Sequence, residues 1–455
     1  MKICNIHIKG YQQFNNLFLD FTNPINGEPV KKVCLIGRNG TGKSTLLNFL
    51  NGFLPIMSKL NYRSLPFLLM KLKLKNQYVY LFCSSYYVKN LIFNTDIESE
   101  ENWFEKLSNE KDTNTIREKL SNYNSYQIIG EELKDIVKEL QFRDNSSDLL
   151  IFSPAESQQN SYLQVGDVPQ TSLDKALKLF SLFPFHHNVS DQNVTDFWKV
   201  LIFLMKKRDN EREIFENKEE NLDRTKKDLI ESFEKDNPKI LNNLADLWNK
   251  ILSNAGLEFD VENASNPIQL NDNLTAYIQL KSTKQRINYN QLSTGIRNFI
   301  FRVGHIYSLY FSREIKRGFL LLDEPGNSLF PDFLFELIDS YQNLLIDKNR
   351  ENNTQFFVST HNPIIAAQFE PFERIILEWD ENGGVEAYKG IAPIGDDPND
   401  ILLKDFKLKN LMGKKGQEMW NTYLDLRKKL KKTEDEEAKK ELISQINKIG
   451  TDYNF

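Results

Sequence analysis

A glycine-rich segment near the start of the chain has the residue types that bind phosphate groups. Gly37-Arg38-Asn39-Gly40-Thr41-Gly42-Lys43-Ser44 follows an apolar run, 33–36, and precedes a helical segment, 44–50. Glycines allow positive φ, so that backbone N–H groups turn inward toward an anion. The Lys43 ammonium suits the β and γ phosphates, and the Ser44 hydroxyl suits Mg²⁺. The pattern predicts a nucleotide site made of Gly37, Asn39, Gly40, Thr41, Gly42, Lys43, Ser44 and Thr45.

Two further strand-like segments end in residues that could complete such a site. The run 318–322 is apolar enough for a strand buried on both faces, and Asp323 and Glu324 follow it. Asp323 is predicted to support Mg²⁺, and Glu324 to act as the base that orients the attacking water. His361 follows the run 356–360 and could donate to a γ-phosphate oxygen. The alternative interpretations are a solvated acidic turn and a packed or capping histidine.

These segments, in this order, resemble the ABC-type ATPase heads of the SMC, RecF and OLD group. The likeness extends to AAA family ATPases of bacterial anti-phage systems of the Septu and PARIS kind. It covers about residues 1–55 and 285–380, and it rests on the opening hairpin 2–21, the signature-like Leu292-Ser293-Thr294-Gly295, the Walker B and D-loop stretch 323–331, and Thr360-His361-Asn362-Pro363. The resemblance implies an α/β P-loop head with a mixed central sheet, an antiparallel β subdomain, a helical lobe and a C-terminal helical tail.

The resemblance also implies a mechanism in which two heads face each other with two ATP molecules between them. Ser293 and Gly295 would contact the γ-phosphate held by the partner's Lys43, with ATP and Mg²⁺ as cofactors. A helix beginning near Gly295 favours an anion at its N-terminus. By itself, however, Leu-Ser-Thr-Gly is also an ordinary helix cap.

The chain departs from the family pattern at three positions. Thr294 replaces the second glycine of the usual signature, and the D-loop carries Gly326 and Phe330 where relatives often have an acid and a histidine. These departures leave ATP binding intact but put the rate of hydrolysis in question. For the glutamine-bearing loop, Glu156 and Gln158 are candidates, with a plain loop as the alternative.

Composition limits the function classes. The 455 residues contain 58 Lys plus Arg against 63 Asp plus Glu, so the net charge of −5 gives no overall nucleic-acid footprint, although a local basic patch is allowed. Cys4, Cys34 and Cys83 lack metal-ligand spacing, which favours a reduced, cytoplasmic protein. No signal peptide and no apolar run long enough for a membrane span is found, so we expect no membrane association.

Five regions are predicted along the chain. They are the N-terminal part of the head with the phosphate loop (1–55), an α/β insertion (56–200), a helical lobe (201–256), the C-terminal part of the head (257–390) and a helical tail (391–455). In 56–150 we predict helical segments and one clear strand, 78–82. Pro238 separates two short helices in the lobe, which form either a solvated lobe or a partner-docking pair.

Turn and cap signals organise the C-terminal part. The Asn382-Gly383-Gly384 turn predicts a hairpin over 375–388. Asn399 or Asp400 is the expected N-cap after the polar link 390–402. In the tail we expect one helix over 417–430 and a second from the capping box 433–436 to Ile449, with a lysine cluster at the bend.

The main hypothesis is a cytoplasmic ATPase that serves as the sensor or regulatory subunit of a bacterial anti-phage system. It would control an effector nuclease in trans, because the sequence shows no acid-rich TOPRIM-like segment after residue 400 and no histidine–asparagine–histidine nuclease pattern. Expected partners are a second copy through ATP-bridged heads, with a higher oligomer open, a separate effector protein, and DNA as a further candidate. The alternatives are a RecF-like DNA-repair ATPase and a low-turnover, ATP-dependent assembly scaffold.

Overall fold

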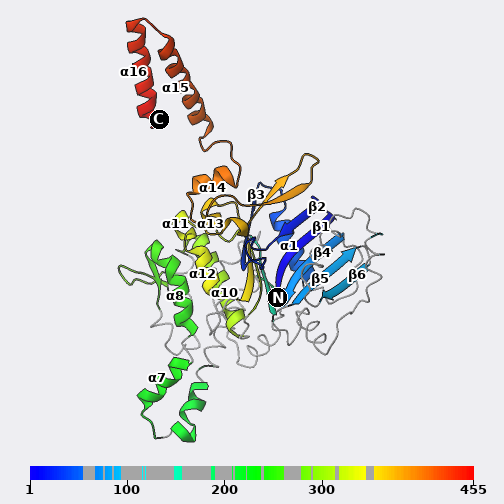
Figure 1. The fold of residues 1–455 in the computed structure, drawn as a ribbon. Coiled ribbons are helices and arrows are strands. Elements are labelled where there is room, and N and C mark those ends of the chain that lie inside the picture. The colour runs from blue at the N-terminus through cyan, green and yellow to red at the C-terminus, as the bar shows by residue number, and fades with distance from the viewer. Residues whose placement is uncertain are drawn as a thin grey trace. The chain divides into compact units, whose positions relative to one another are not determined.

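The computed structural model forms two compact units, Met1–Asp396 and Asp397–Phe455 (Figure 1). The first unit contains every segment with predicted phosphate chemistry, and the second contains the last three helices. The structure describes residues 1–54, 67–74, 77–84, 87–93, 115, 118, 148–155, 186–189, 208, 211–221, 223–236, 240–260, 278–287, 291–312, 317–344 and 353–455.

A seven-stranded sheet forms the centre of the first unit, with the strand order β14-β13-β3-β12-β11-β7-β8. All neighbouring strands are parallel except β13 and β14, so the sheet is mixed, as predicted. Its strands are β3 (Lys32–Gly37), β7 (Asp148–Ser153), β8 (His186–Asn188), β11 (Arg317–Asp323), β12 (Asn353–Ser359), β13 (Arg374–Trp379) and β14 (Val385–Lys389).

Strands β11 and β12 lie in the interior of this sheet, and their sequences explain why. Every residue of β11 after Arg317 and of β12 after Asn353 is buried, which needs the continuous apolar runs seen in both. The pairing sets Asp323 opposite Ser359, and Ser359 opposite Leu35. The carboxyl ends of β3, β12 and β11 therefore meet at one edge of the sheet.

A five-stranded antiparallel sheet, β2-β1-β4-β5-β6, packs on the same core. It corrects one expectation, because three of its strands and the start of β7 lie within 56–150, where we predicted a single strand. A short apolar run such as that of β4 cannot be told from a helix by periodicity alone. The strands are β1 (Lys2–Tyr11), β2 (Phe14–Asp20), β4 (Phe67–Leu74), β5 (Gln77–Ser84) and β6 (Tyr87–Phe93).

Helix α1 (Lys43–Phe53) begins directly after the phosphate loop and buries its apolar face in this shared core. Leu46, Leu47 and Leu50 are fully buried there, in one cluster with residues of both sheets. Burial of that face holds the start of α1, and with it Lys43 and Ser44, against the ends of the central strands.

The helical lobe packs on the helix that carries the signature-like segment. Helices α7 (Lys226–Asp236) and α8 (Ile240–Leu252) are the two predicted helices, and the predicted break at Pro238 lies outside the described residues. The buried Trp248 indole of α8 donates to the carbonyl of Ile300, 3.2 Å away, in α10 (Thr294–Ser312). Helix α12 (Leu337–Leu344) contacts both α8 and α10.

The remaining elements of the first unit are short. No helix in the described part of the chain is both long and apolar enough to cross a membrane. These elements are η3 (Glu219–Asn221), η4 (Ser253–Ala255), β9 (Leu257–Phe259), β10 (Ile278–Leu280), α11 (Pro331–Leu334), α13 (Pro363–Ala366) and η7 (Pro371–Glu373).

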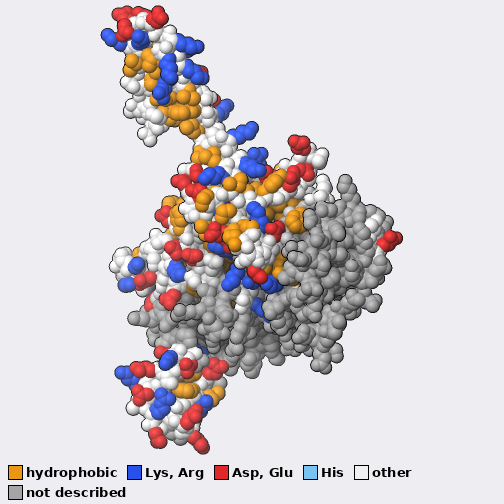
Figure 2. All heavy atoms as spheres, in the orientation of Figure 1, with side chains coloured by type: hydrophobic (Ala, Val, Ile, Leu, Met, Phe, Trp, Pro, Cys, Tyr) orange, Lys and Arg blue, Asp and Glu red, His pale blue; other side chains and the backbone are white. Residues whose placement is uncertain are grey.

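The second unit consists of α14 (Pro398–Lys404), α15 (Lys414–Lys432) and α16 (Glu436–Tyr453). Helices α15 and α16 pair with each other, yet no residue of either is fully buried. Figure 2 shows hydrophobic and basic side chains together on the surface of this unit.

Both predicted caps in this region were wrong. Asp397, rather than Asn399 or Asp400, is the N-cap of α14, because Pro398 takes the first helical position and Asp397 accepts from the Asn399 N–H at 2.7 Å. Helix α16 begins after Asp435, which accepts from the Ala438 N–H, whereas Thr433 ends α15.

Candidate functional site

The phosphate loop connects β3 to α1. It requires glycine at two positions where neighbouring groups approach its backbone too closely for a side chain. Gly37 and Gly42 have φ values of 150° and 99°. A Cβ at Gly37 would lie 2.3 Å from the Leu377 carbonyl oxygen, and one at Gly42 would lie 2.6 Å from the Phe14 ring. The loop is thus enclosed by β13 on one side and by the opening hairpin on the other.

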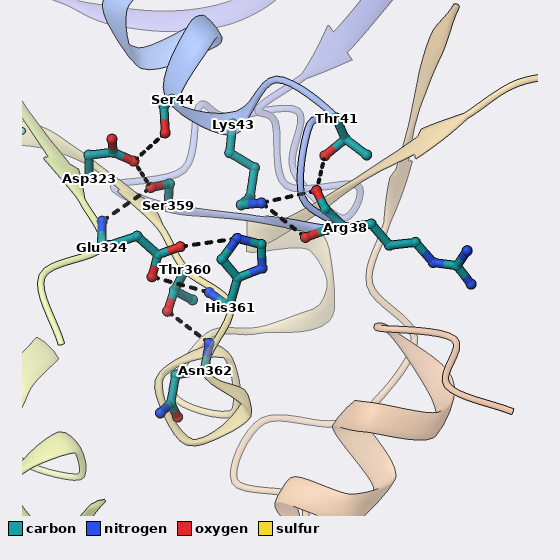
Figure 3. Close-up of polar contacts among 11 residues, drawn as sticks. Arg38, Thr41, Lys43, Ser44, Asp323, Glu324, Ser359, Thr360, His361 and Asn362 are labelled. Carbon is teal, nitrogen blue, oxygen red and sulfur yellow. Dashed lines mark hydrogen bonds and ion pairs between the residues drawn. The ribbon is translucent and has the colours of Figure 1, made fainter. Parts of the chain in front are cut away.

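Lys43 lies at the centre of this loop (Figure 3). Its ammonium donates to the carbonyls of Gly37, at 3.0 Å, and Arg38, at 3.3 Å, and the residue is only 6% exposed. Burial lowers the pKa of Lys43, while Glu324 and Asp323 raise it. A buried ammonium in the first turn of a helix is an electrostatic site for an anion such as a phosphate.

Ser44 and Asp323 face each other across the loop and form the candidate metal site. The Ser44 hydroxyl donates to Asp323 Oδ1 at 2.9 Å, although the residues are 279 positions apart. The Ser359 hydroxyl donates to the same carboxylate oxygen (Figure 3). One hydroxyl and one carboxylate fit Mg²⁺, which prefers oxygen ligands, takes few from the protein and keeps several waters.

Glu324 follows Asp323 in a conformation that is uncommon for a residue with a side chain. Its φ is +45°, and its N–H donates to the carbonyl and the hydroxyl oxygens of Ser359, at 3.1 and 3.2 Å. Burial is the main cause that raises the pKa of Glu324 to about 7. Positive φ in a non-glycine residue and a carboxyl poised near neutral pH are both typical of functional sites.

His361 approaches Glu324 with both its backbone and its ring. Its N–H donates to Glu324 Oε2 at 3.3 Å, and its Nε2 lies 3.5 Å from Oε1 (Figure 3). Burial, and then the charge of Lys43, lower the pKa of His361, so the imidazole is neutral at pH 7. The contact is therefore a polar one between a neutral ring and a carboxyl group, not an ion pair. The ring is 43% exposed, so it remains accessible to a ligand.

The signature-like residues lie elsewhere on the same unit. Ser293 is exposed, and its hydroxyl accepts from the Ile296 N–H at 3.4 Å, as a helix cap does. A Cβ at Gly295 would lie 2.0 Å from the Ser328 carbonyl oxygen, so the signature-like segment packs directly on the D-loop backbone. Within the described ranges, no hydrogen bond joins Ser293 or Gly295 to the phosphate loop of the same chain.

Two of the departures from the family pattern, Gly326 and Phe330, can be examined in the structure. A Cβ at Gly326 would lie 2.6 Å from Ile365 Cδ1 and 2.8 Å from Leu334 Cδ2, so an acid at this position would have to displace the ends of these two side chains. Phe330, near the end of the D-loop stretch 323–331, is 62% exposed. The two candidates for the glutamine-bearing loop, Glu156 and Gln158, lie outside the described residues.

Two residues of the site were missed by the sequence analysis. Ser359 contacts both acids, and Gln13 reaches the phosphate loop, donating to the Gly40 carbonyl at 3.4 Å and to Thr45 Oγ1 at 3.3 Å. Ser359 had a signal, because it ends the strand that precedes His361. Gln13 had none beyond its place in the opening hairpin. Of the other predicted nucleotide contacts, Asn39 is exposed at the tip of the loop, and Thr41 donates to the Arg38 carbonyl at 2.9 Å.

Comparisons with known proteins give a family for the chain and similar solved structures. A family model described as AAA ATPase domain matches residues 1–366. Solved structures that match include a crystal structure of the SmcHead bound to the C-winged helix domain of ScpA. The match covers 85% of this chain and 98% of that chain, at 13% identity and a TM-score of 0.38. No curated protein matches the chain.

Proposed function

This chain belongs to the AAA ATPase domain family, and from that premise we propose that it binds ATP with Mg²⁺ at the phosphate loop and hydrolyses it. The observation that carries the proposal is the hydrogen bond between Ser44 and Asp323, with Lys43 and Glu324 beside it. Four residue types needed for phosphoryl transfer converge from two distant segments of the chain.

Each residue has a role in the proposed reaction. The loop N–H groups and Lys43 hold the phosphates, and Ser44 and Asp323 would hold Mg²⁺, which offsets charge on the phosphate oxygens. Glu324 takes a proton from the attacking water, a task that suits a carboxyl group with a pKa of about 7. His361 positions the Glu324 carboxylate through its backbone N–H, and its exposed ring is free to donate to the terminal phosphate.

Ser293 and Gly295 are proposed to complete the site of a second copy. The support is local: the exposed Ser293 stands at the N-terminal end of the 19-residue helix α10, where backbone N–H groups favour an anion. Two heads would then enclose two ATP molecules, and hydrolysis would require the dimer. The expected signature is a turnover per chain that rises with protein concentration.

For the biological role, we propose a sensor or regulatory subunit of a bacterial anti-phage system that controls an effector nuclease in trans. What supports this is the resemblance of the motif set to the ATPases of such systems. A RecF-like role at DNA predicts that DNA stimulates turnover. A scaffold role predicts tight ATP binding and ATP-dependent assembly with little turnover, in keeping with the changed residues Thr294, Gly326 and Phe330.

The deciding experiment compares ATP turnover of the wild type with that of Lys43→Ala and Glu324→Gln, with and without double-stranded DNA. Lys31→Ala is the matched control, because Lys31 is an exposed lysine directly before β3, the strand that leads into the phosphate loop. Loss of turnover in both site variants but not in Lys31→Ala would support the site. Equal turnover in wild type and Lys43→Ala would contradict it.

The wider role needs a separate measurement. Purification of the native chain from its host, with identification of proteins encoded beside its gene, tests for an effector in trans. Recovery of a co-encoded nuclease would support the regulatory role. If no co-encoded protein is bound and DNA stimulates turnover, the DNA-repair role replaces it.

A further inference from the structure

An exposed indole lies against the phosphate loop. Trp379 is the last residue of β13 and is 47% exposed, while Ile375 and Leu377, on the same face of the strand, are buried. Strand β13 runs parallel to β3 with Leu377 opposite Gly37, so Trp379 stands beside the loop. A Cβ built at Gly40 would lie 3.7 Å from Trp379 Cζ2, so the edge of the indole is close to the backbone of the loop.

The strand order shows which end of a bound nucleotide would reach this indole. The acids Asp323 and Glu324 and the ring of His361 follow β11 and β12, which lie on one side of β3. Strand β13 lies on the other side. Because the terminal phosphate must lie between Lys43 and the acids, the rest of the nucleotide would extend away from them, toward β13.

The turn that follows Trp379 is tied to its neighbours. The Asp380 carboxylate accepts from the N–H groups of Asn382, at 2.8 Å, and Gly384, at 2.7 Å, which closes the turn of the β13–β14 hairpin. A Cβ at Gly384 would lie 3.1 Å from Asn15 Nδ2, so the turn also meets the opening hairpin. The same opening hairpin supplies Gln13 to Gly40 and Thr45. The indole therefore sits at a corner built by the phosphate loop and two hairpins.

We propose that Trp379 is the platform on which the base of the bound nucleotide stacks. This inference rests on the proposed ATP site and adds a base contact that the phosphate-binding motif does not contain. An indole face offers a large π surface without reading the edge of a base. The chain should thus favour purine over pyrimidine nucleotides, because a purine overlaps more of the indole, and should discriminate weakly among purines.

Titration calorimetry with three Mg²⁺-bound probes tests this inference: ATP, CTP and inorganic tripolyphosphate. All variants carry Glu324→Gln, so that nucleotide is not consumed. Trp379→Ala is expected to bind ATP about tenfold more weakly, within the range of measured stacking contributions, and to bind tripolyphosphate as the parent does. Trp379→Phe should keep most of the ATP affinity. Tyr388→Ala is the matched control, since Tyr388 is a 43% exposed aromatic on the other strand of the same hairpin.

Different experimental outcomes would contradict the stacking contact and the proposed ATP binding. If Trp379→Ala lowers the affinities for ATP and for tripolyphosphate equally, Trp379 acts by supporting the phosphate loop and not by contacting the base. That result would overturn the inference. Unchanged ATP affinity in Trp379→Ala overturns it as well. Parent protein that binds neither ATP nor tripolyphosphate better than its Lys43→Ala variant would contradict the proposed function itself and the stacking contact with it. As a second readout, ATP should quench the tryptophan fluorescence of the parent but not that of Trp379→Phe.

Discussion

Ser359 stands directly opposite Asp323 in the parallel pairing of β12 with β11, and its hydroxyl donates to the Asp323 carboxylate. The same hydroxyl oxygen accepts from the Glu324 N–H at 3.2 Å. One fully buried side chain therefore orients the carboxylate proposed for the metal and the backbone of the proposed base.

Replacing Ser359 should weaken the metal site more than the fold. In Ser359→Ala, Asp323 loses one of the two hydroxyl groups that orient it, and outer contacts of this kind typically contribute tenfold or more to metal affinity. We expect the free Mg²⁺ concentration for half-maximal turnover to rise about tenfold. Ser340→Ala, which alters an equally buried serine in α12, should leave the Mg²⁺ dependence unchanged. An unshifted Mg²⁺ curve in Ser359→Ala would contradict the role.

Glu324→Gln should separate binding from chemistry. An amide cannot accept a proton from water, so turnover should fall by about 10²- to 10⁴-fold, the usual contribution of a positioned base. ATP affinity should stay within about threefold, because the phosphates are held by the loop and Lys43. Single-turnover kinetics and nucleotide titration measure the two quantities. The control is Glu336→Gln, an exposed acid in the same unit, and a comparable loss in that variant would remove the argument for Glu324.

Turnover should depend on pH through Glu324. Burial raises its pKa from 4.5 to about 7, and a base must be ionised to accept a proton. Turnover should therefore increase as pH rises through about 7 and level off above it. A pH–rate profile checks this, and the residual turnover of Glu324→Gln should lack this limb. A wild-type profile that is flat from pH 6 to pH 8 would show that Glu324 does not titrate in the reaction.

The motifs of the site could be predicted from the sequence because each is local. A glycine loop after an apolar strand, or acids after another, carries its structural context within a few residues. Ser359 had a local signal at the end of its strand, but its position opposite Asp323 depends on strand register. The contribution of Gln13 could not be predicted, since it depends on the packing of the hairpin on the loop.

The sequence-based predictions of helix caps and of the strand β4 were also wrong, for a different physical reason. Asp397 competed with two equally suitable cap residues nearby, and only the position of Pro398 decides between them. Strand β4 is stabilised by pairing with β1 and β5, whose positions a local pattern does not contain.

Introducing the acid that relatives carry in the D-loop should destabilise this protein. In Gly326→Asp, the new side chain would press on the buried ends of Ile365 and Leu334. Overpacking of this kind costs about 1 to 3 kcal/mol of unfolding free energy. Urea denaturation measures it, with Gly413→Asp as control, because nothing lies within 4 Å of a Cβ at Gly413. Equal stability of Gly326→Asp and wild type would show that the pocket yields.

Arg302 links the signature-bearing helix to the end of β7. Its guanidinium donates to the carbonyls of Pro154, at 2.9 Å, and Ala155, at 3.0 Å, and the residue is buried. Arg302→Met should lower the unfolding free energy by about 2 kcal/mol, because two partly buried carbonyls lose a charged donor. Urea denaturation of this variant beside Arg286→Met, an exposed arginine, checks the magnitude. A cost no larger than that of Arg286→Met would show that water replaces the guanidinium.

The order of the site's parts along the chain has a consequence for synthesis. Ser44 precedes its partner Asp323 by 279 residues. At roughly 5 to 20 residues per second, about 14 to 56 s separate the emergence of the two from a ribosome. During that interval the nascent chain carries a phosphate loop without either acid. The proposed hydrolysis therefore cannot begin until synthesis has passed Asp323, Glu324 and His361.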